Sequence, residues 1–402
     1  MIPASCLPRA TLALLALLAI EVPTSLSAAT PPSPVVEALA PVKVAEFVPI
    51  GAQNLASFAA KVRSRQPVVI GFLGGSITVG AGSSSGQAYR IVTQRLLSAE
   101  IEHRGSKVSS RVSATGGTGS GFGVYRVGRE LLEPPVDLLV VEYAVNNFTQ
   151  VQKGPAGVAS TVDSMEAIVR QALRANPEIG LVFFSTSQVV QQEGFYNQGL
   201  ISPSVLAHHR VAAHYGIMEV LTGPSITREL AAGKFTLEQF FPDKTHPSDV
   251  GHALYGKLLA EAIISALDQV PAAPRPVPPR LGTGALEYAR MDLVPAGNSG
   301  WTLKEKGNGS ITCDRAGQSV HFTVKGAKPA LVYNGRLKVT WSSGGQAHEK
   351  ILTGAVGQPA PSSWAFPAEV LPDATGVSVE ALPGDDGLFK SQLLGVTSIQ
   401  AP

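Results

Sequence analysis

Two distant stretches of the sequence contain three side chains with the types needed for nucleophilic attack on a carbonyl. Ser76 follows the apolar run "VVIGFLG" and lies between glycines and the β-branched residues Ile77 and Thr78. A serine needs a nearby base to accept its proton, and the base needs an acid that orients it. "DKTHP" supplies both, because Asp243 precedes His246 by three residues and its carboxylate reaches Nδ1 within one tight turn. We therefore expect Ser76, His246 and Asp243 to act as nucleophile, base and orienting acid.

The same reaction needs hydrogen-bond donors for the oxyanion that develops on the substrate. The backbone N–H of Ser76, a glycine N–H from "TGGTG" and the side-chain amide of Asn146 in "VEYAVNNF" are donors of the right kind. Glycine suits such a loop because a side chain would block close approach of the substrate.

Apolar runs and amphipathic segments alternate through the first two thirds of the chain, which predicts a parallel sheet covered by helices on both faces. Three of the polar stretches follow predicted strands, and the carboxyl ends of parallel strands meet at one edge of a sheet. The sequence therefore predicts that these polar stretches converge at that edge.

After "DKTHP", Pro247 favours an extended backbone at His246 and Ser248 is a candidate helix cap. The predicted strands are "PVVIGFLG", "KVSSRVSA", "VDLLVVEYA" and "IGLVFFSTS", and the predicted helices are "QAYRIVTQRLLSAEIEHR", "VASTVDSMEAIVRQALRAN" and "SVLAHHRVAAHYG".

Composition changes at "DQVPAAPRPVPPRLG", a proline run that reads as a stiff linker. Beyond it, short alternating runs such as "SVHFTVKG" and "GVSVEALPGDDGLFK" are typical of an all-β sandwich. Of the three tryptophans in this part, Trp301, Trp341 and Trp364, we expect at least two to pack in its core. The predicted organisation is a signal peptide at 1–29, a Pro/Ala-rich lead-in at 30–44, a catalytic domain at 45–268, a proline-rich linker at 269–281 and a β-sandwich accessory domain at 282–402.

The first 29 residues have the pattern of an export signal, with a short n-region, the apolar run "TLALLALLAI" and small residues before the expected cleavage site. We expect a secreted or periplasmic protein with no stable membrane insertion after cleavage, and an uncleaved anchor is the alternative. The 402 residues carry a net charge of +2 and no run of Lys and Arg, so nucleic acid is not an expected partner. Cys313 is left alone once Cys6 is removed, which excludes an intramolecular disulfide.

Other functional readings of these motifs fit less well. "GFLGGSITVG" lacks the lysine of a phosphate-binding P-loop, and "GGTGSGFG" does not have dinucleotide-binding spacing. Thr78 stands where the nucleophile elbow of α/β-hydrolases has a second glycine. His208, His209 and His214 share a helical stretch without a carboxylate, so we expect no metal there. No cofactor is expected either.

Four blocks in order resemble the SGNH hydrolase superfamily, also called GDSL esterases and lipases: "GFLGGSITVG", "ATGGTGS", "VEYAVNN" and "DKTHPSDVGH". The resemblance covers about residues 45 to 268. It implies a flavodoxin-like α/β/α sandwich, with Ser76 as nucleophile, His246 as base and Asp243 as acid. It also implies Ser76, Gly117 and Asn146 as oxyanion donors. Two departures are the GGSIT form of the first block and Asn147 where the family usually has Asp.

Together these features predict a serine esterase that hydrolyses O-acyl esters, and we expect O-acetyl esters, on a carbohydrate. A lipid or aryl esterase with the same triad is one alternative. A non-catalytic glycan-binding protein on a hydrolase scaffold is another, although the complete set of Ser, Asn and Asp-x-x-His argues against it.

Overall fold

The structure of the chain is a computed structural model, and it describes most of the first two thirds of the chain and parts of the last third. The predicted signal peptide, most of the predicted lead-in, the first half of the proline run and Trp364 lie outside the described residues. The described ranges are 39–269, 276–292, 301–303, 311–313, 315, 317–323, 327–343, 345–353, 368–370, 376–383 and 391–399.

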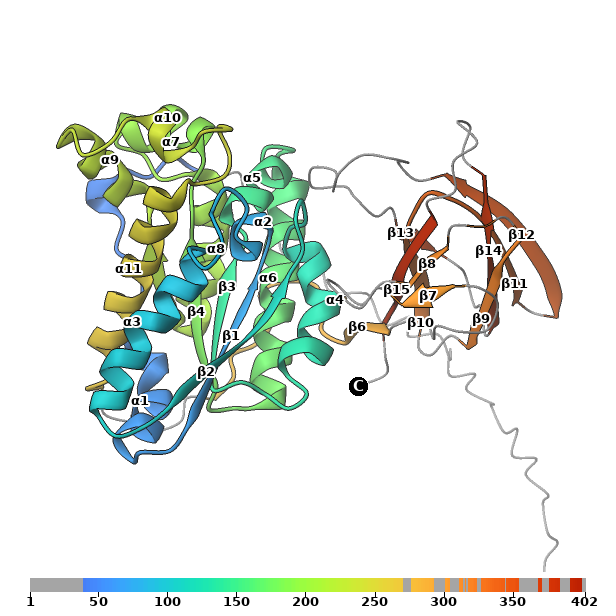
Figure 1. Ribbon diagram of the computed structural model, residues 1–402, viewed down its shortest axis with the longest axis horizontal. Coiled ribbons are helices and arrows are strands. Elements are labelled where there is room, and N and C mark those ends of the chain that lie inside the picture. The colour runs from blue at the N-terminus through green and yellow to red at the C-terminus, as the bar shows by residue number, and fades with distance from the viewer. Residues whose placement is uncertain are drawn as a thin grey trace, which may run out of the picture. The chain divides into compact units, whose positions relative to one another are not determined.

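A five-stranded parallel sheet forms the centre of the first domain (Figure 1). Its order is β2-β1-β3-β4-β5, the flavodoxin-like order, so the chain turns from one side of β1 to the other between β2 and β3. Ligands of such sheets bind beyond the carboxyl ends of the strands at this switch point. The strands are β1 (Val68–Gly74), β2 (Val108–Ala114), β3 (Leu138–Glu142), β4 (Gly180–Ser185) and β5 (Met218–Leu221), of which the sequence analysis did not identify β5.

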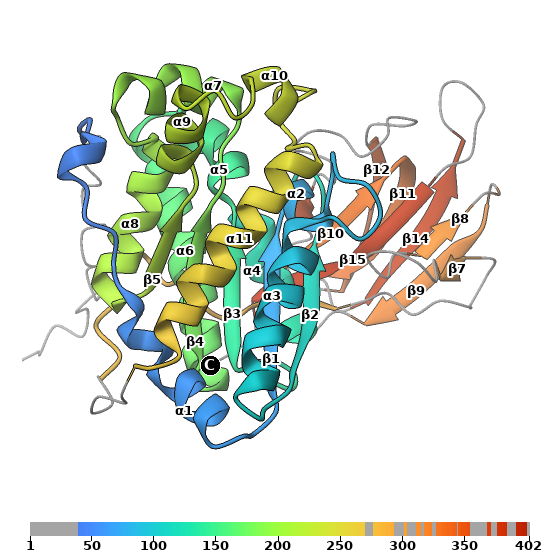
Figure 2. The same cartoon turned by 60° about the vertical axis from the view of Figure 1, so that its left-hand side comes forward.

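Helices cover both faces of the sheet and produce two separate hydrophobic cores. Helices α1, α3 and α11 bury their apolar residues on one face, and α4, α6 and α8 do so on the other. Figure 2 shows α3 and α11 side by side in front of the strands. The helices that cover the faces are α1 (Ala56–Arg63), α3 (Tyr89–His103), α4 (Ser120–Leu131), α6 (Pro155–Ala175), α8 (Pro203–Tyr215) and α11 (Asp249–Ala266).

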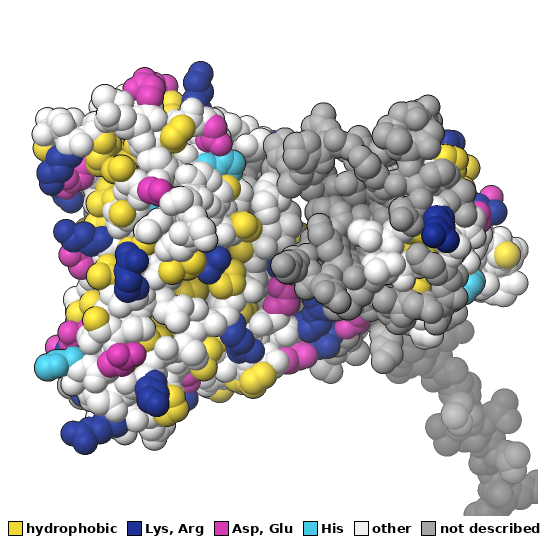
Figure 3. Space-filling view, viewed as in Figure 1, with side chains coloured by type: hydrophobic (Ala, Val, Ile, Leu, Met, Phe, Trp, Pro, Cys, Tyr) yellow, Lys and Arg dark blue, Asp and Glu magenta, His cyan; other side chains and the backbone are white. Residues whose placement is uncertain are grey.

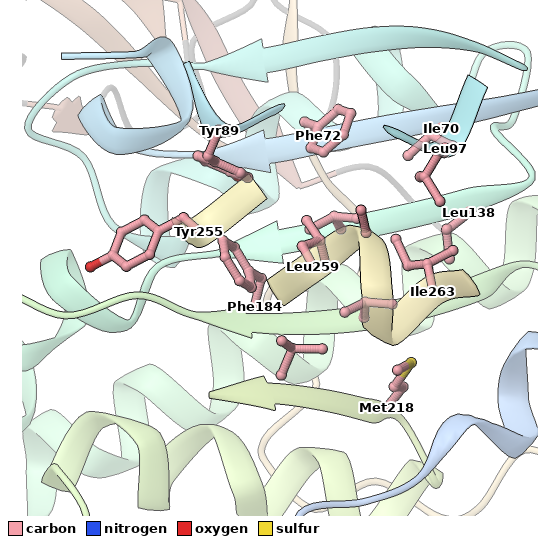
Figure 4. Close-up of a cluster of buried hydrophobic side chains, with 14 of the residues drawn as sticks. Ile70, Phe72, Tyr89, Leu97, Leu138, Phe184, Met218, Tyr255, Leu259 and Ile263 are labelled. Carbon is pink, nitrogen blue, oxygen red and sulfur yellow. The ribbon is translucent and has the colours of Figure 1, made fainter. Parts of the chain in front are cut away.

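The first core is filled by aromatic and aliphatic side chains between the sheet and α11 (Figure 4). Tyr89, Phe184 and Tyr255 pack there edge-on or tilted, with ring centroids 5.0 Å and 6.0 Å apart, and all three are fully buried. Burying such rings removes large apolar surfaces from water and fixes the helices against the strands. The edge of the sheet above them is therefore a rigid base for a site.

Shorter helices follow the strand ends and complete this edge. Helix α2 begins one residue beyond the end of β1 and α5 one residue beyond the end of β3. They are α2 (Ser76–Val79), α5 (Ala144–Val151), α7 (Val189–Gly194), α9 (Gly223–Ala231) and α10 (Leu237–Phe240), with 3₁₀ turns η1 (Val44–Glu46), η2 (Ala52–Leu55) and η3 (Tyr196–Gln198).

The last third of the chain is antiparallel β structure. A four-stranded sheet has the order β12-β11-β14-β9, and a second sheet contains β13-β10-β15-β8-β7 with β6 paired to β15. Residues from both sheets share one buried cluster, to which Trp301 belongs and against which Trp341 packs. The strands are β6 (Ala289–Asp292), β7 (Thr302–Leu303), β8 (Ile311–Cys313), β9 (Ser319–Thr323), β10 (Ala327–Asn334), β11 (Arg336–Ser343), β12 (Gln346–Thr353), β13 (Ala368–Val370), β14 (Gly376–Leu382) and β15 (Ser391–Ile399).

The expected fold class, a flavodoxin-like α/β/α sandwich followed by an all-β region, is confirmed. The alternation of strands and helices was sufficient for this because β1, β3 and β4, the inner strands of the parallel sheet, are mainly apolar runs, whereas the edge strands β2 and β5 contain polar residues. Strand β12 was missed, since "QAHEKILT" carries charged residues on its exposed side and reads as a loop.

The described part of the proline-rich segment is held against α6 by hydrogen bonds, which a free linker would not make. The backbone N–H groups of Leu281 and Gly282 donate to the two carboxylate oxygens of Glu166 at 2.6 and 2.7 Å. Thr283 donates to Asp163 through its backbone N–H at 2.8 Å. Residues 281–283 are therefore fixed on the α/β domain.

The surface of the α/β domain carries charges of both signs. On the face seen in Figure 3, lysine, arginine and acidic side chains are interspersed among the described residues. None of the helices in the described ranges has the length and apolar character required to cross a membrane.

Candidate active site

The turn from β1 into α2 presents Ser76 at the carboxyl edge of the sheet, as its first helical residue. The two glycines before it are required by close packing. A Cβ on Gly74 would collide with the side chain of Thr78, and a Cβ on Gly75 would collide with Oδ1 of Asn146. This explains why a buried strand ends in "GGS": only residues without a side chain fit between the nucleophile turn and the end of β3.

His246 and Asp243 lie in the loop between α10 and α11, and they form a continuous hydrogen-bonded chain with Ser76. His246 Nε2 is 2.8 Å from Ser76 Oγ, and His246 Nδ1 is 2.6 Å from Asp243 Oδ2. If Asp243 accepts the Nδ1 proton, Nε2 is free to accept the proton of Ser76. The structure thus brings together three residues that are up to 170 positions apart in the sequence.

The loop that carries this pair is more exposed than the serine turn. The Asp243 side chain is 57% exposed and that of His246 is 25% exposed. Partial burial raises the pKa of Asp243, but the backbone N–H and the ring of His246, with the backbone N–H of Thr245, outweigh it and leave that pKa below its ordinary value. Asp243 is therefore ionised at neutral pH.

Ser248 does not cap α11 through its side chain as we expected. It occupies the N-cap position, but its Oγ donates to the carbonyl of Gln239 at 2.7 Å, and no side-chain cap bond forms. The hydroxyl instead ties α10 to the start of α11, on either side of the loop that carries Asp243 and His246.

Two segments that were expected to supply oxyanion donors lie close to Ser76. A Cβ built on Gly116 would lie 3.7 Å from Ser76 Cβ, so this glycine loop borders the nucleophile. Gly117 follows with a φ of 72°, a left-handed conformation that favours glycine. The Asn146 side chain lies against Gly75, next to Ser76. The buried Oδ1 of Asn146 has no hydrogen-bond partner among the described residues.

Asn147, at the position where Asp is usual, joins three parts of the α/β domain. Its Oδ1 accepts from the backbone N–H of Ser120 at 3.1 Å, and its Nδ2 donates to Ser120 Oγ at 2.8 Å and to His208 Nε2 at 2.9 Å. Burial lowers the pKa of His208 to about 3, so its imidazole is neutral and accepts at Nε2. An amide satisfies this site because it donates, which a carboxylate cannot do.

A second loop, residues 80–88, packs behind His246. A Cβ on Gly82 would lie 3.1 Å from the Cβ of His246 and would collide with the Pro247 carbonyl. His252 Nε2 lies 3.0 Å from the carbonyl of Ala81, and its Nδ1 accepts from the backbone N–H of Tyr89 at 3.1 Å. Burial lowers the pKa of His252, which favours the neutral ring that these two bonds require.

The sequence analysis missed a buried carboxylate next to the turn that carries Ser76. Glu142, the last residue of β3, is fully buried and contacts Thr78 and Thr186 through its carboxylate. The glutamate in "VVEYA" interrupts an apolar strand, and that interruption was the available signal.

No group of three or more His, Cys, Asp or Glu side chains among the described residues is placed to hold a metal ion. His209 Nδ1 lies 2.8 Å from Glu219 Oε2, which is a pair and not a ligand set. The site as described consists of the serine, imidazole and carboxylate chain with its surrounding donors.

Comparison with known proteins places this geometry in context. Residues 72–254 match the model of the GDSL-like Lipase/Acylhydrolase family. No curated relative matches the sequence.

Among solved structures, the chain is similar to a two-domain esterase active on acetylated mannans that was co-crystallised with mannopentaose. The identity is 19% and the TM-score 0.65, and the match covers 88% of this chain and 96% of that one. It is also similar to the lipase/acylhydrolase from Enterococcus faecalis, at 20% identity and a TM-score of 0.38, covering 51% of this chain and all of that one. An acetyl xylan esterase from Geobacillus stearothermophilus matches at 17% identity and a TM-score of 0.38, covering 50% of this chain and 95% of that one. The likeness to the two-domain esterase extends over both parts of the chain and shows a shared fold.

Proposed function

From the premise that residues 72–254 belong to the GDSL-like lipase/acylhydrolase family, and that the chain is a carboxylic ester hydrolase, we propose that it removes O-acetyl groups from a carbohydrate. The resemblance to this family that the four sequence blocks indicate is thereby confirmed. The acetyl group and the carbohydrate are the proposed part.

The observation that carries the proposal is the chain of hydrogen bonds from Ser76 Oγ through the His246 ring to Asp243, with distances of 2.8 and 2.6 Å. In the proposed mechanism Ser76 Oγ attacks the ester carbonyl while His246 Nε2 takes its proton. His246 then returns that proton to the leaving sugar hydroxyl. A water molecule, deprotonated by His246, then attacks the acyl-enzyme, and His246 returns that proton to Ser76 Oγ as acetate leaves. Asp243 holds the Nδ1–H tautomer throughout.

The tetrahedral oxyanion is stabilised by the N–H groups of Ser76 and Gly117 and by the Asn146 amide. Gly116 borders Ser76 and Asn146 packs against Gly75, so both donor segments flank the nucleophile. Donors fixed in place before the reaction stabilise the developing charge without reorganisation.

The carbohydrate substrate is supported by the fold shared with the two-domain esterase, which is active on acetylated mannans. The export-signal pattern of residues 1–29, with its apolar run, supports export of the protein from the cell. Polysaccharides of this kind are found outside the cell. We assign catalysis to residues 45–268 and an accessory role to the β-sandwich of residues 282–402.

The test is acetate release from acetylated mannan and acetylated xylan by the full chain, beside p-nitrophenyl esters with short and long acyl groups. We expect acetate from at least one polymer and a preference for the acetyl ester, both abolished in Ser76→Ala. Hydrolysis of long-chain esters in preference to acetyl esters, with no acetate from either polymer, would assign the chain to lipid esters and refute the proposal.

A further inference from the structure

Glu142 is a fully buried carboxylate whose hydrogen-bond donors flank the nucleophile in the sequence. Its Oε2 accepts from Thr78 Oγ1 at 2.8 Å, and Thr78 lies two residues after Ser76. The backbone N–H groups of Gly75 and Thr78 also stabilise its charged form. From the opposite side, Oε1 accepts from Thr186 Oγ1, beyond the end of β4, at 2.6 Å.

These contacts surround the carboxylate with donors only. Thr78 Oγ1 donates to Glu142, so the Tyr89 hydroxyl, 2.9 Å from the same Oγ1, donates to Thr78. The hydrogen bonds thus run from Tyr89 to Thr78 to Glu142. An ionised carboxylate accepts all of them, whereas a protonated one adds a donor and must break or reverse at least one. The arrangement fits the ionised form.

We propose that Glu142 is a positioning residue, whose ionised carboxylate fixes the turn from Gly75 to Thr78 and thereby places Ser76 against His246 and the oxyanion donors. This role rests on the proposed function, because it concerns the geometry of the same nucleophile. Gly74 and Gly75 contribute no side chains and fit closely against Thr78 and Asn146, while Ile77 is buried in the first hydrophobic core. The carboxylate of Glu142 adds hydrogen bonds to this packing.

The surroundings of Glu142 make its charge depend on pH near neutrality. Burial raises its pKa to about 7 and outweighs the hydrogen bonds from Thr186, Thr78 and Gly75, which lower it. The titratable groups that face it are the phenols of Tyr89 on α3, Tyr143 after β3 and Tyr255 on α11, all with raised pKa values and therefore neutral. Arg90, on α3, donates to the carbonyl of Thr78 at 3.0 Å.

The first test is Glu142→Gln in the full chain, assayed with p-nitrophenyl acetate. The amide has nearly the same shape but carries two hydrogens into a cage of donors. We expect kcat to fall roughly 10²-fold, the order of loss that a small misplacement of reacting groups causes. KM should stay within about twofold, because ground-state binding is not affected.

The pH profile separates this role from a purely structural one. In the wild type, kcat/KM should fall on the acid side as Glu142 takes up a proton. In Glu142→Gln this part of the fall should be absent. The native wild type keeps a proton on Glu142 that the unfolded chain releases near pH 4.5, so its free energy of unfolding falls as the pH rises from 4.5 to about 7. That decline should disappear in the variant.

A matched pair at Thr186 keeps the proposal testable if Glu142→Gln does not fold. Thr186→Val removes the hydroxyl donor and should move the acid limb of kcat/KM to higher pH, because the ionised carboxylate loses one of its partners. Thr186→Ser keeps the hydroxyl and should restore the wild-type limb. Esterase activity of the wild type is measured in the same assay, so a failure of the proposed function is seen independently.

An acid limb that is identical in the wild type, Thr186→Val and Thr186→Ser would overturn the proposal. A folded Glu142→Gln that retains kcat within about threefold of the wild type would do the same, since this is far below the loss expected for a displaced nucleophile.

Discussion

The turn that carries Ser76 and the loop that carries Asp243 and His246 meet at one hydrogen bond, but different kinds of contact hold them in place. Ser76 sits above a fully buried carboxylate and between segments from β2, β3 and β4. Asp243 and His246 lie in a more exposed loop, in which Asp243 Oδ1 accepts from the backbone N–H groups of Thr245 and His246 at 2.9 and 2.7 Å. One backbone bond, from the Val189 N–H to the Lys244 carbonyl at 3.0 Å, ties this loop to α7.

This difference shows how the position of the Ser76 hydroxyl and the orientation of the His246 ring are each fixed. A side chain with one rotatable bond before its hydroxyl, such as Ser76, is placed by its backbone, so the backbone is fixed by distant elements. The imidazole is oriented by its hydrogen bond to Asp243, and a local turn is enough to provide it. The position of Ser76 therefore depends mainly on tertiary contacts, whereas the contact between Asp243 and His246 depends mainly on a local turn.

The largest effect is expected from removing either side of the hydrogen bond that joins the two regions. Ser76→Ala and His246→Ala should each lower kcat by about 10⁶-fold on p-nitrophenyl acetate, and the double variant should lose no more, because triad members act as a unit. Steady-state kinetics with circular dichroism as a folding control test this. More than a few per cent of activity in folded Ser76→Ala would rule out the mechanism.

Asp243→Asn should lower kcat by about 10⁴-fold despite the exposure of this side chain. The amide would donate to Nδ1 and favour the tautomer with a proton on Nε2, which cannot accept from Ser76. Asp243→Ala removes the carboxylate without imposing the wrong tautomer, so it should lose less than Asp243→Asn. Equal losses for the two variants would show that orientation of the ring, and not its tautomer, is the function of Asp243.

Asn146→Ala should lower kcat by about 10²–10³-fold, the usual loss of one oxyanion donor. The effect belongs to the nucleophile side of the site, where Asn146 packs against Gly75. KM should change far less than kcat, since the donor acts on the transition state. A rise in KM alone, measured over a full substrate range, would mean that Asn146 binds only the ground state.

Asn147→Asp should leave activity within a few-fold of the wild type, because the side chain anchors Ser120 and His208 and does not reach Ser76. A carboxylate beside His208 favours the charged imidazole, so the pKa of His208 should rise from about 3. Titration of the His208 ring signals by NMR measures the shift. An unchanged His208 pKa would contradict the neutral pairing seen here.

The smallest effect on catalysis is expected from shortening the chain, because both halves of the triad lie before Leu267. A chain ending at Leu267 should hydrolyse p-nitrophenyl acetate with nearly the wild-type kcat. Glu166 would lose two backbone donors, and each such hydrogen bond contributes about 1.5–3 kcal/mol to stability. The melting temperature of this chain should therefore be lower than that of a chain ending at Asp292. Thermal denaturation of both tests the contribution of residues 281–283. Collapse of kcat in both would show that the β region is part of the active site.

Much of the fold could be predicted because its signals are local. Apolar runs and amphipathic segments identified four of the five parallel strands and the covering helices α3, α6 and α8 but not α4, and the change after the prolines identified the β region. Short or polar elements such as β5 and β12 were missed, since four residues, or a strand with a charged exposed face, do not stand out from loops. The docking of residues 281–283 on Glu166 was also missed, because a proline run looks the same whether it is free or bound.

The sequence by itself determined the chemistry of the site. Residue types and their order indicated Ser76, His246, Asp243 and Asn146, and the resemblance to the SGNH hydrolases implied Gly117. The three-residue spacing of Asp243 and His246 defines a contact that a single turn can make. Tertiary structure alone decided what holds the nucleophile. Glu142 is 64 positions from Thr78 and 44 from Thr186, and Asn147 is 61 positions from His208. A buried charge is tolerated only where distant donors converge on it, and that convergence is a property of the packed sheet and not of any segment.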